Sequence, residues 1–244
     1  MNGFPCIHCV LSKMGLGSTV FVMGVWALQT GIRILMGAAV GALCGWASLT
    51  WACRLLQNRG REERLGDTVQ KLIIVAAGLC GGFVGYCTGG WLPGLVALAL
   101  LTVALTVGVS DWLCRVIPNP TVLAIFAVKL LLIALSLLKR PGLPAFSLLS
   151  SLGGMVFCFA LFFAPGLFGK QVGAGDIKLA AAMGFLLGFY DALLAVVIMG
   201  LLVIAYSLAQ RQMPLLAFLK TNIPMGPFIA AGMVAAYLLP YMTL

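Results

Sequence analysis

The succession of apolar runs is the feature that most constrains the fold of this chain, because each run is close to the ~20 residues that a helix needs to cross a bilayer. The first run is weak, since it holds Gly15, Gly17 and Gln29, and the seventh is short. The sequence therefore predicts an all-α fold, a polytopic transmembrane helix bundle with eight spans, or nine if the first run is a span of its own. The runs cover approximately residues 14–30, 32–53, 72–90, 92–110, 120–138, 145–168, 177–190, 192–210 and 226–243.

The composition supports a membrane protein. Hydrophobic residues make up 62% of the chain and charged residues only 9%, whereas a soluble domain carries about 25% charged residues. The formal net charge of +9 does not indicate nucleic-acid binding, because most basic residues stand singly between apolar runs, where Lys and Arg set the topology. We therefore expect a lipid bilayer as partner and no nucleic acid.

The longest polar segment, residues 54–71, orients the chain. It holds five basic residues and three acids, so the positive-inside rule predicts a short cytoplasmic loop. One dibasic loop, Lys139-Arg140, falls on the outside and conflicts, but several concordant segments outweigh it. We expect a multi-pass protein of the cell (inner) membrane. The other cytoplasmic segments are 111–119, 169–176 and 211–225, which carry Arg115, Lys170, Arg211 and Lys220.

Three acids lie outside that loop: Asp111, Asp176 and Asp191. Asp191 stands at a predicted outer turn, where helix capping explains it. Asp111 and Asp176 lie at the cytoplasmic ends of spans, so the topology puts them on the same side of the membrane. An acid at membrane depth is costly, and it is treated as a functional-site hypothesis.

Two carboxyl groups brought close together have a specific chemistry. They share a proton, so that their apparent pKa values separate. The ionised partner can take a proton from water as general base, and the protonated partner can hydrogen-bond the scissile carbonyl. This is aspartic peptidase chemistry, which needs no metal, no cofactor and no covalent intermediate.

The sequences around the two acids fit this role. Gly173 and Gly175 leave room for a substrate backbone beside Asp176. Pro118 and Pro120 end regular structure after Asp111. Lys178 could anchor to lipid headgroups or lower the pKa of the neighbouring carboxyl group.

Simpler interpretations stay open at this point. The motif G-x-G-D is so short that it can occur by chance, and by itself it is weak evidence. Asp176 could cap a helix that begins at Ile177, and Asp111 could pair with Arg115, four residues on.

Four motifs resemble those of the type IV prepilin peptidase family. G-A-G-D-I-K-L at 173–179 resembles its G-x-G-D motif, and D-W-L-C-R-V-I-P-N at 111–119 is similar to its first catalytic motif. I-P-M-G-P-F-I-A at 223–230 resembles its I-P-F-G-P motif, and residues 37–60 resemble its first span and the arginine that follows. The order and spacing match, so the resemblance covers roughly 35–243.

The resemblance implies that Asp111 and Asp176 are the catalytic pair of an integral-membrane aspartic endopeptidase. This family cleaves the short basic leader of type IV prepilin and pseudopilin precursors at the cytoplasmic face, so such precursors are the expected partners. We expect eight further residues to bind substrate or support the pair: Gly173, Gly175, Lys178, Pro118, Asn119, Pro224, Gly226 and Pro227.

The chain departs from the family in its N-terminal half. Bifunctional members carry two C-x-x-C pairs between their first two core spans and also N-methylate the product, but the loop 54–71 holds no cysteine. We therefore expect no methylation that depends on S-adenosylmethionine. We assign residues 1–31 to an N-terminal extension and 32–244 to a membrane-embedded aspartic peptidase domain.

Cysteine use gives little support for a metal site. Cys6 and Cys9 form a C-x-x-C in the N-terminal extension, a zinc pair at most, because no second pair completes a tetrahedral site. The other cysteines lie in apolar runs and are expected to be small buried hydrophobes.

Lys129 lies near the middle of the run 120–138, where a charge is costly. We expect it to snorkel or to face the bundle interior, with a salt bridge to a catalytic aspartate as an alternative. Two further classes stay open for the whole chain: a small proton-coupled carrier that uses the same acids, and a non-catalytic assembly factor for a pilus or secretion apparatus.

Overall fold

The computed structural model describes residues 17–57, 66–139, 144–167, 173–209 and 224–242. Every regular element in these ranges is an α-helix, which confirms the predicted all-α class. The helices, in chain order, are α2 (Gly17–Gln57), α3 (Asp67–Cys87), α4 (Trp91–Cys114), α5 (Asn119–Lys139), α6 (Pro144–Leu167), α7 (Ala174–Leu187), α8 (Phe189–Ala209) and α10 (Gly226–Met242).

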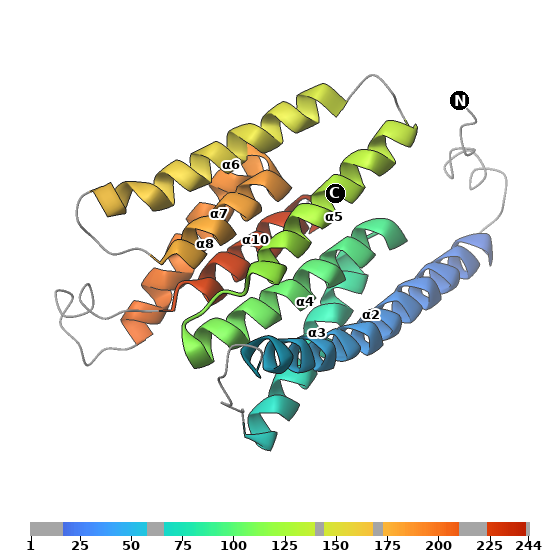
Figure 1. The fold of residues 1–244 in the computed structure, drawn as a ribbon. Helices are drawn as coiled ribbons and strands as arrows, with labels where there is room; N and C mark the ends of the chain where they lie inside the picture. Colours follow the sequence, from blue (N-terminus) through green and yellow to red (C-terminus); the bar gives the residue numbers. More distant parts are fainter. Residues whose placement is uncertain (1–16, 58–65, 140–143, 168–172, 210–223, 243–244) are drawn as a thin grey trace.

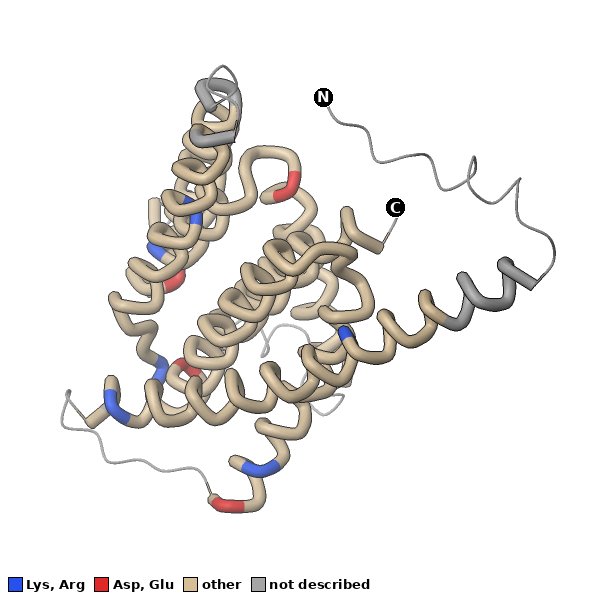
Figure 2. The backbone as a smooth tube through the Cα atoms, turned by 90° about the vertical axis from the view of Figure 1, so that its right-hand side faces the viewer, with Lys and Arg blue, Asp and Glu red and all other residues tan. Residues whose placement is uncertain are grey.

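Most of these helices are long and apolar enough to cross a bilayer. Six candidate spans lie in α2, α3, α4, α5, α6 and α8, and α10 is a shorter apolar helix. Figure 2 shows long stretches of the described helices without a charged residue. The structure therefore confirms a polytopic helical bundle.

The first two predicted runs form one helix rather than two. From Gly17 the chain continues without a break to Gln57, over 41 residues. A break near Gln29 or Gly31 would leave backbone N–H and C=O groups unpaired, which is costly in an apolar environment, whereas one glycine in a helix costs only about 1 kcal/mol. A separate ninth span at 14–30 is therefore wrong for the described part of that range.

Helices α2 and α3 pack closely through glycines. A Cβ atom on Gly41 would lie 2.8 Å from the Cα atom of Gly81, and one on Gly37 would collide with the Gly81 carbonyl oxygen. Small residues let helix backbones approach in this way in membrane bundles.

The core of the bundle forms where α4, α7 and α10 meet. Leu100 and Val107 of α4, Met183 of α7 and Ile229 and Met233 of α10 are buried in one apolar cluster. Figure 1 shows α10 in the middle of the bundle, with the C-terminal end of α4 and the N-terminal ends of α5, α7 and α10 at one end. The packing thus gathers four helix termini that are far apart in the sequence.

Candidate active site

Asp111 lies in the last turn of α4. Asp111 is buried, with 5% of its surface exposed. The helix stops at Cys114 because Arg115 adopts a left-handed conformation (φ 52°), and the N–H of Arg115 donates to the carbonyl oxygen of Asp111 over 2.9 Å. Pro118 then begins the turn into α5, where its carbonyl oxygen accepts a hydrogen bond from the Thr121 hydroxyl group over 2.7 Å.

Asp176 lies in the first turn of α7. That helix begins at Ala174 and its N-cap residue is Gly173, which provides no side-chain cap. The interpretation of Asp176 as the cap of a helix that begins at Ile177 is therefore wrong. A Cβ atom on Gly173 would lie 2.9 Å from Oδ2 of Asp176, so the half-buried carboxyl group occupies the space that this glycine leaves.

Gly226 is the first residue of α10, and it binds Asp111 directly. Its backbone N–H donates to Oδ2 of Asp111 over 2.8 Å. A Cβ atom at Gly226 would lie 2.8 Å from the same oxygen atom, so this close approach requires glycine. The carboxyl group also faces the N-terminal end of a helix, which favours negative charge. The hydrogen bond that the structure gives this carboxyl group comes from Gly226, and the charge of Arg115, the partner in the simpler interpretation, also acts on Asp111.

The first two motifs also touch each other. A Cβ atom on Gly175 would lie 3.1 Å from the Cβ atom of buried Ile117. The short connection after α4 therefore packs on the first turn of α7. Ile117 was not among the predicted site residues, although it belongs to the I-P-N step of the first motif.

The electrostatics of Asp176 reflect the proximity of Asp111. Asp176 lies outside the six candidate spans. Burial and, to a smaller extent, the nearby charge of Asp111 together raise the pKa of Asp176 to about 6. Lys178 does not lower this pKa, so that expectation is wrong. Lys178 is exposed, and residues two positions apart on a helix do not face each other.

The remaining predicted residues line the same helix ends to different degrees. Pro118 is buried and Pro224 is half-buried, whereas Asn119, the first residue of α5, is exposed. Pro227 is half-buried at the second position of α10, where proline fits because the first turn of a helix has unpaired N–H groups in any case. Gly226 is thus buried and Gly175 half-buried, whereas Gly173, Asn119 and Lys178 are exposed.

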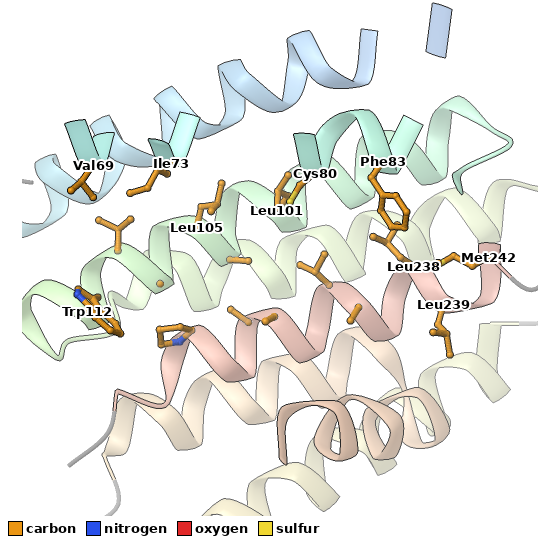
Figure 3. Close-up of a pocket in the computed structure, with 18 residues that line it drawn as sticks. Val69, Ile73, Cys80, Phe83, Leu101, Leu105, Trp112, Leu238, Leu239 and Met242 are labelled. Atoms are coloured by element: carbon orange, nitrogen blue, oxygen red, sulfur yellow. The ribbon is translucent and has the colours of Figure 1, made fainter. Parts of the chain in front are cut away.

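An apolar groove of about 700 Å³ runs between α3, α4 and α10. Figure 3 shows Val69, Ile73 and Phe83 on one side of it and Leu238 and Met242 on another. Among the residues that the structure describes, its wall includes Trp112 and Pro227, the neighbours of Asp111 and Gly226, but no acid. The acid chemistry therefore belongs to the helix ends and not to this groove.

The cysteine pair of the N-terminal extension, Cys6 and Cys9, lies outside the described residues. Within the described ranges, no three His, Cys, Asp or Glu side chains gather as metal ligands would. Cys114 and Cys158 are buried as expected, whereas Cys80 is exposed and lines the apolar groove.

Lys129 faces the bundle interior, as expected for a lysine in the middle of a span. Its Nζ atom donates to the carbonyl oxygen of Leu186 in α7 over 2.9 Å. The alternative of a salt bridge to a catalytic aspartate is therefore wrong.

Comparison with known proteins gives one match. Residues 98–208 match the model of the type IV leader peptidase family. The comparison with curated proteins and the comparison with solved structures gave no match. The matched range contains Asp111 and Asp176 and ends before α10, and it implies peptidase activity in general. Residues 98–208 are thus similar to the type IV leader peptidase family.

Proposed function

We propose that this protein is an integral-membrane aspartic endopeptidase that cleaves the leader of type IV prepilin-like or pseudopilin precursors. The observation that carries the proposal is the meeting of three chain segments at one end of the bundle. Gly226 donates to Asp111, Ile117 packs on Gly175, and the charge of Asp111 acts on Asp176.

The environments of the two acids suggest different roles. Asp111 accepts a backbone hydrogen bond at the N-terminal end of α10, and both features favour the carboxylate form. We assign Asp111 as the general base that takes a proton from the attacking water. Asp176, with a pKa of about 6, holds a proton below this pH, and we assign it as the donor to the scissile carbonyl oxygen.

With these roles, the two acids together hold one proton both before and after the reaction. Water adds its oxygen to the scissile carbonyl carbon while Asp111 gains a proton and Asp176 gives one to the carbonyl oxygen. The tetrahedral diol collapses, the C–N bond breaks, and the leaving nitrogen receives the proton that Asp111 holds. A proton from the hydroxyl group returns to Asp176, so the pair ends with the single proton with which it began.

The glycines near the pair would admit a peptide. Gly173 is exposed at the start of α7, and it lacks a side chain on the side where the carboxyl group of Asp176 lies. Because Gly173 is exposed and has no side chain, an extended substrate backbone could approach this first turn of α7 from its exposed side.

The side of the membrane follows from the charges of the sequence. The basic loop 54–71 predicts a cytoplasmic location for the C-terminal end of α4 and the start of α7. We therefore propose that cleavage occurs at the cytoplasmic face of the inner membrane. We also propose cleavage without N-methylation, because that loop holds no cysteine.

Asparagine substitutions test the proposal. The purified protein in lipid vesicles would be mixed with a type IV prepilin precursor, and mature pilin would be quantified over time. Asp111→Asn and Asp176→Asn are each expected to lower the rate by about 10²–10⁴-fold, the range for loss of general acid or base catalysis. Asp67→Asn, at the exposed start of α3, is the matched control and should leave the rate unchanged.

The cleavage assay, complementation of a deletion strain and an uptake assay together separate the proposed function from its alternatives. Full processing by either asparagine variant would overturn the proposal. Complementation of a deletion strain by both variants would indicate a non-catalytic assembly factor. Proton-coupled uptake that requires Asp176, without any proteolysis, would indicate a carrier.

A further inference from the structure

We infer that Lys129 is a positioning residue for Asp176: its ammonium group binds the C-terminal end of α7 and so fixes the helix whose first turn carries Asp176. The inference rests on the proposed function for its meaning in catalysis. The contact itself joins α5 and α7 across 57 positions of the sequence.

The acceptor of Lys129 is an oxygen that a helix leaves without a partner. Leu186 is the second-last residue of α7, and the last four carbonyl groups of a helix have no intrahelical N–H partner. The C-terminal end of a helix also carries partial negative charge, which attracts a cation. The ammonium group of the half-buried Lys129, 2.9 Å from this oxygen, therefore provides both a hydrogen-bond donor and a positive charge to the helix end.

Helix α5 and the turn before it hold α7 at both ends. Near the N-terminal end of α7, Ile117 packs on Gly175. Near its C-terminal end, the rings of Phe126 and Phe185 are 5.1 Å apart, and Lys129 adds its hydrogen bond. Because a helix of this length is stiff along its axis, a shift at one end moves Asp176 at the other.

The C-terminal end of α7 does not continue as a helix into α8. Gly188 ends α7 with a positive φ of 88°, and α8 begins at Phe189. The N–H of Phe189 donates to the Ser150 hydroxyl oxygen over 3.3 Å, a long contact. The charge of Asp191 in the first turn of α8 also acts on Lys129, so the ammonium group links the ends of both helices.

Helices α6 and α7 pack tightly through glycines. The backbones of Gly154 and Gly184 are in contact, so that a Cβ atom on either would collide with the other. A smooth glycine contact permits sliding along the helix axis more readily than a charged hydrogen bond does. This makes Lys129 the axial anchor.

Three variants test the inference. Lys129→Met removes the charge and keeps the apolar stem, Lys129→Arg keeps a cation, and Lys71→Met, exposed on α3, is the matched control. For Lys129→Met we expect kcat to fall by on the order of tenfold with KM within about twofold, since small misplacements of catalytic groups lower the rate of the chemical step. Lys129→Arg should recover most of the rate, and Lys71→Met should match the parent.

A pH profile separates positioning from a merely structural role. If α7 shifts, Asp176 lies farther from Asp111, the charge repulsion between them weakens, and the alkaline limb of the profile moves to lower pH in Lys129→Met. An unchanged kcat and profile in this variant would overturn the inference. Equal loss of activity in Lys129→Met and Lys129→Arg, with the parent's pH profile, would also overturn it.

Backbone hydrogen exchange gives a second readout that does not depend on cleavage. Lys129→Met should speed exchange both at 183–190, near the lost contact, and at 174–180, around Asp176. Faster exchange only at 183–190 would overturn the inference. If the parent protein cleaves no prepilin, the proposed function fails, while the exchange data still decide whether Lys129 holds the N-terminal turn of α7.

Discussion

The backbone N–H of Gly226 donates to Oδ2 of Asp111 over 2.8 Å, although 115 positions separate the two residues. This contact joins the end of α4 to the start of α10 and leaves no room for a side chain at residue 226. Gly226 belongs to the I-P-M-G-P segment, so the contact also explains why that motif accompanies an aspartate so far upstream.

Gly226→Ala should impair cleavage more than folding. The new Cβ atom would lie 2.8 Å from Oδ2 of Asp111 and 3.0 Å from its Cβ atom, so the carboxyl group must move away from its N–H donor. We expect the cleavage rate to fall by about 10²-fold, the effect of a ~1 Å misplacement. Gly200→Ala is the matched control, because a Cβ atom there meets open space. Equal activity of the two variants in the prepilin assay would refute this prediction.

Cleavage should depend on a proton held by Asp176. The pKa of this residue is raised to about 6 by burial and by the charge of Asp111. Below this pH, Asp176 keeps the proton that it donates to the scissile carbonyl. As the pH rises through about 6, both acids become ionised and the rate should fall. The measurement is kcat against pH in buffers of constant ionic strength; a rate that climbs through this range would contradict the assigned roles.

Asp176→Asn should change how stability depends on pH. The pKa in the folded state is about 6, above the ~3.9 of an unfolded chain. Between these values the unfolded state ionises and the folded state does not, so the parent protein loses stability as the pH rises. The asparagine variant has no such loss. Its thermal midpoint relative to the parent should therefore increase from pH 4 to pH 7.

The control for that comparison is Asp67→Asn, which replaces an exposed acid at the start of α3. It should show a constant difference from the parent over the same pH range. A constant difference for Asp176→Asn as well would mean that the carboxyl group of Asp176 is not perturbed in the folded protein.

Gly188→Ala should destabilise the bundle. Gly188 has a φ of 88°, and a Cβ atom there would lie 2.8 Å from the Ser150 hydroxyl oxygen. Backbone strain at such a position costs on the order of 1–3 kcal/mol, and the displaced hydroxyl group would add to it. Thermal unfolding in detergent should show a lower midpoint than for Gly31→Ala, whose Cβ atom meets open space. Identical midpoints would count against a strained turn.

Several features of the fold and site could be predicted because they depend on local sequence. Hydropathy identified the helices, since burying apolar groups and pairing backbone groups inside one segment are properties of about twenty neighbouring residues. The scarcity of acids singled out Asp111 and Asp176. The motifs around them predicted the family that residues 98–208 match.

Other features depended on a competition between alternative local structures that have similar hydropathy. Gly31 and Gln29 weaken a helix, but the cost of unpaired backbone groups is larger, so α2 continues through them. Helix α7 begins three residues before Ile177, the start that the capping interpretation predicts: Gly173, in an extended conformation and without a side-chain cap, occupies the N-cap instead of Asp176.

The sequence by itself thus determined a helical membrane bundle, the two candidate acids and the family that the segment around them resembles. Only the tertiary structure decided which groups those acids and Lys129 meet: Gly226 beside Asp111, and the Leu186 carbonyl oxygen beside Lys129. The physical reason is that hydropathy and helix propensity act over a few turns of chain. A hydrogen bond across 57 or 115 positions instead depends on how whole helices pack, and here on glycines that allow the backbones to approach.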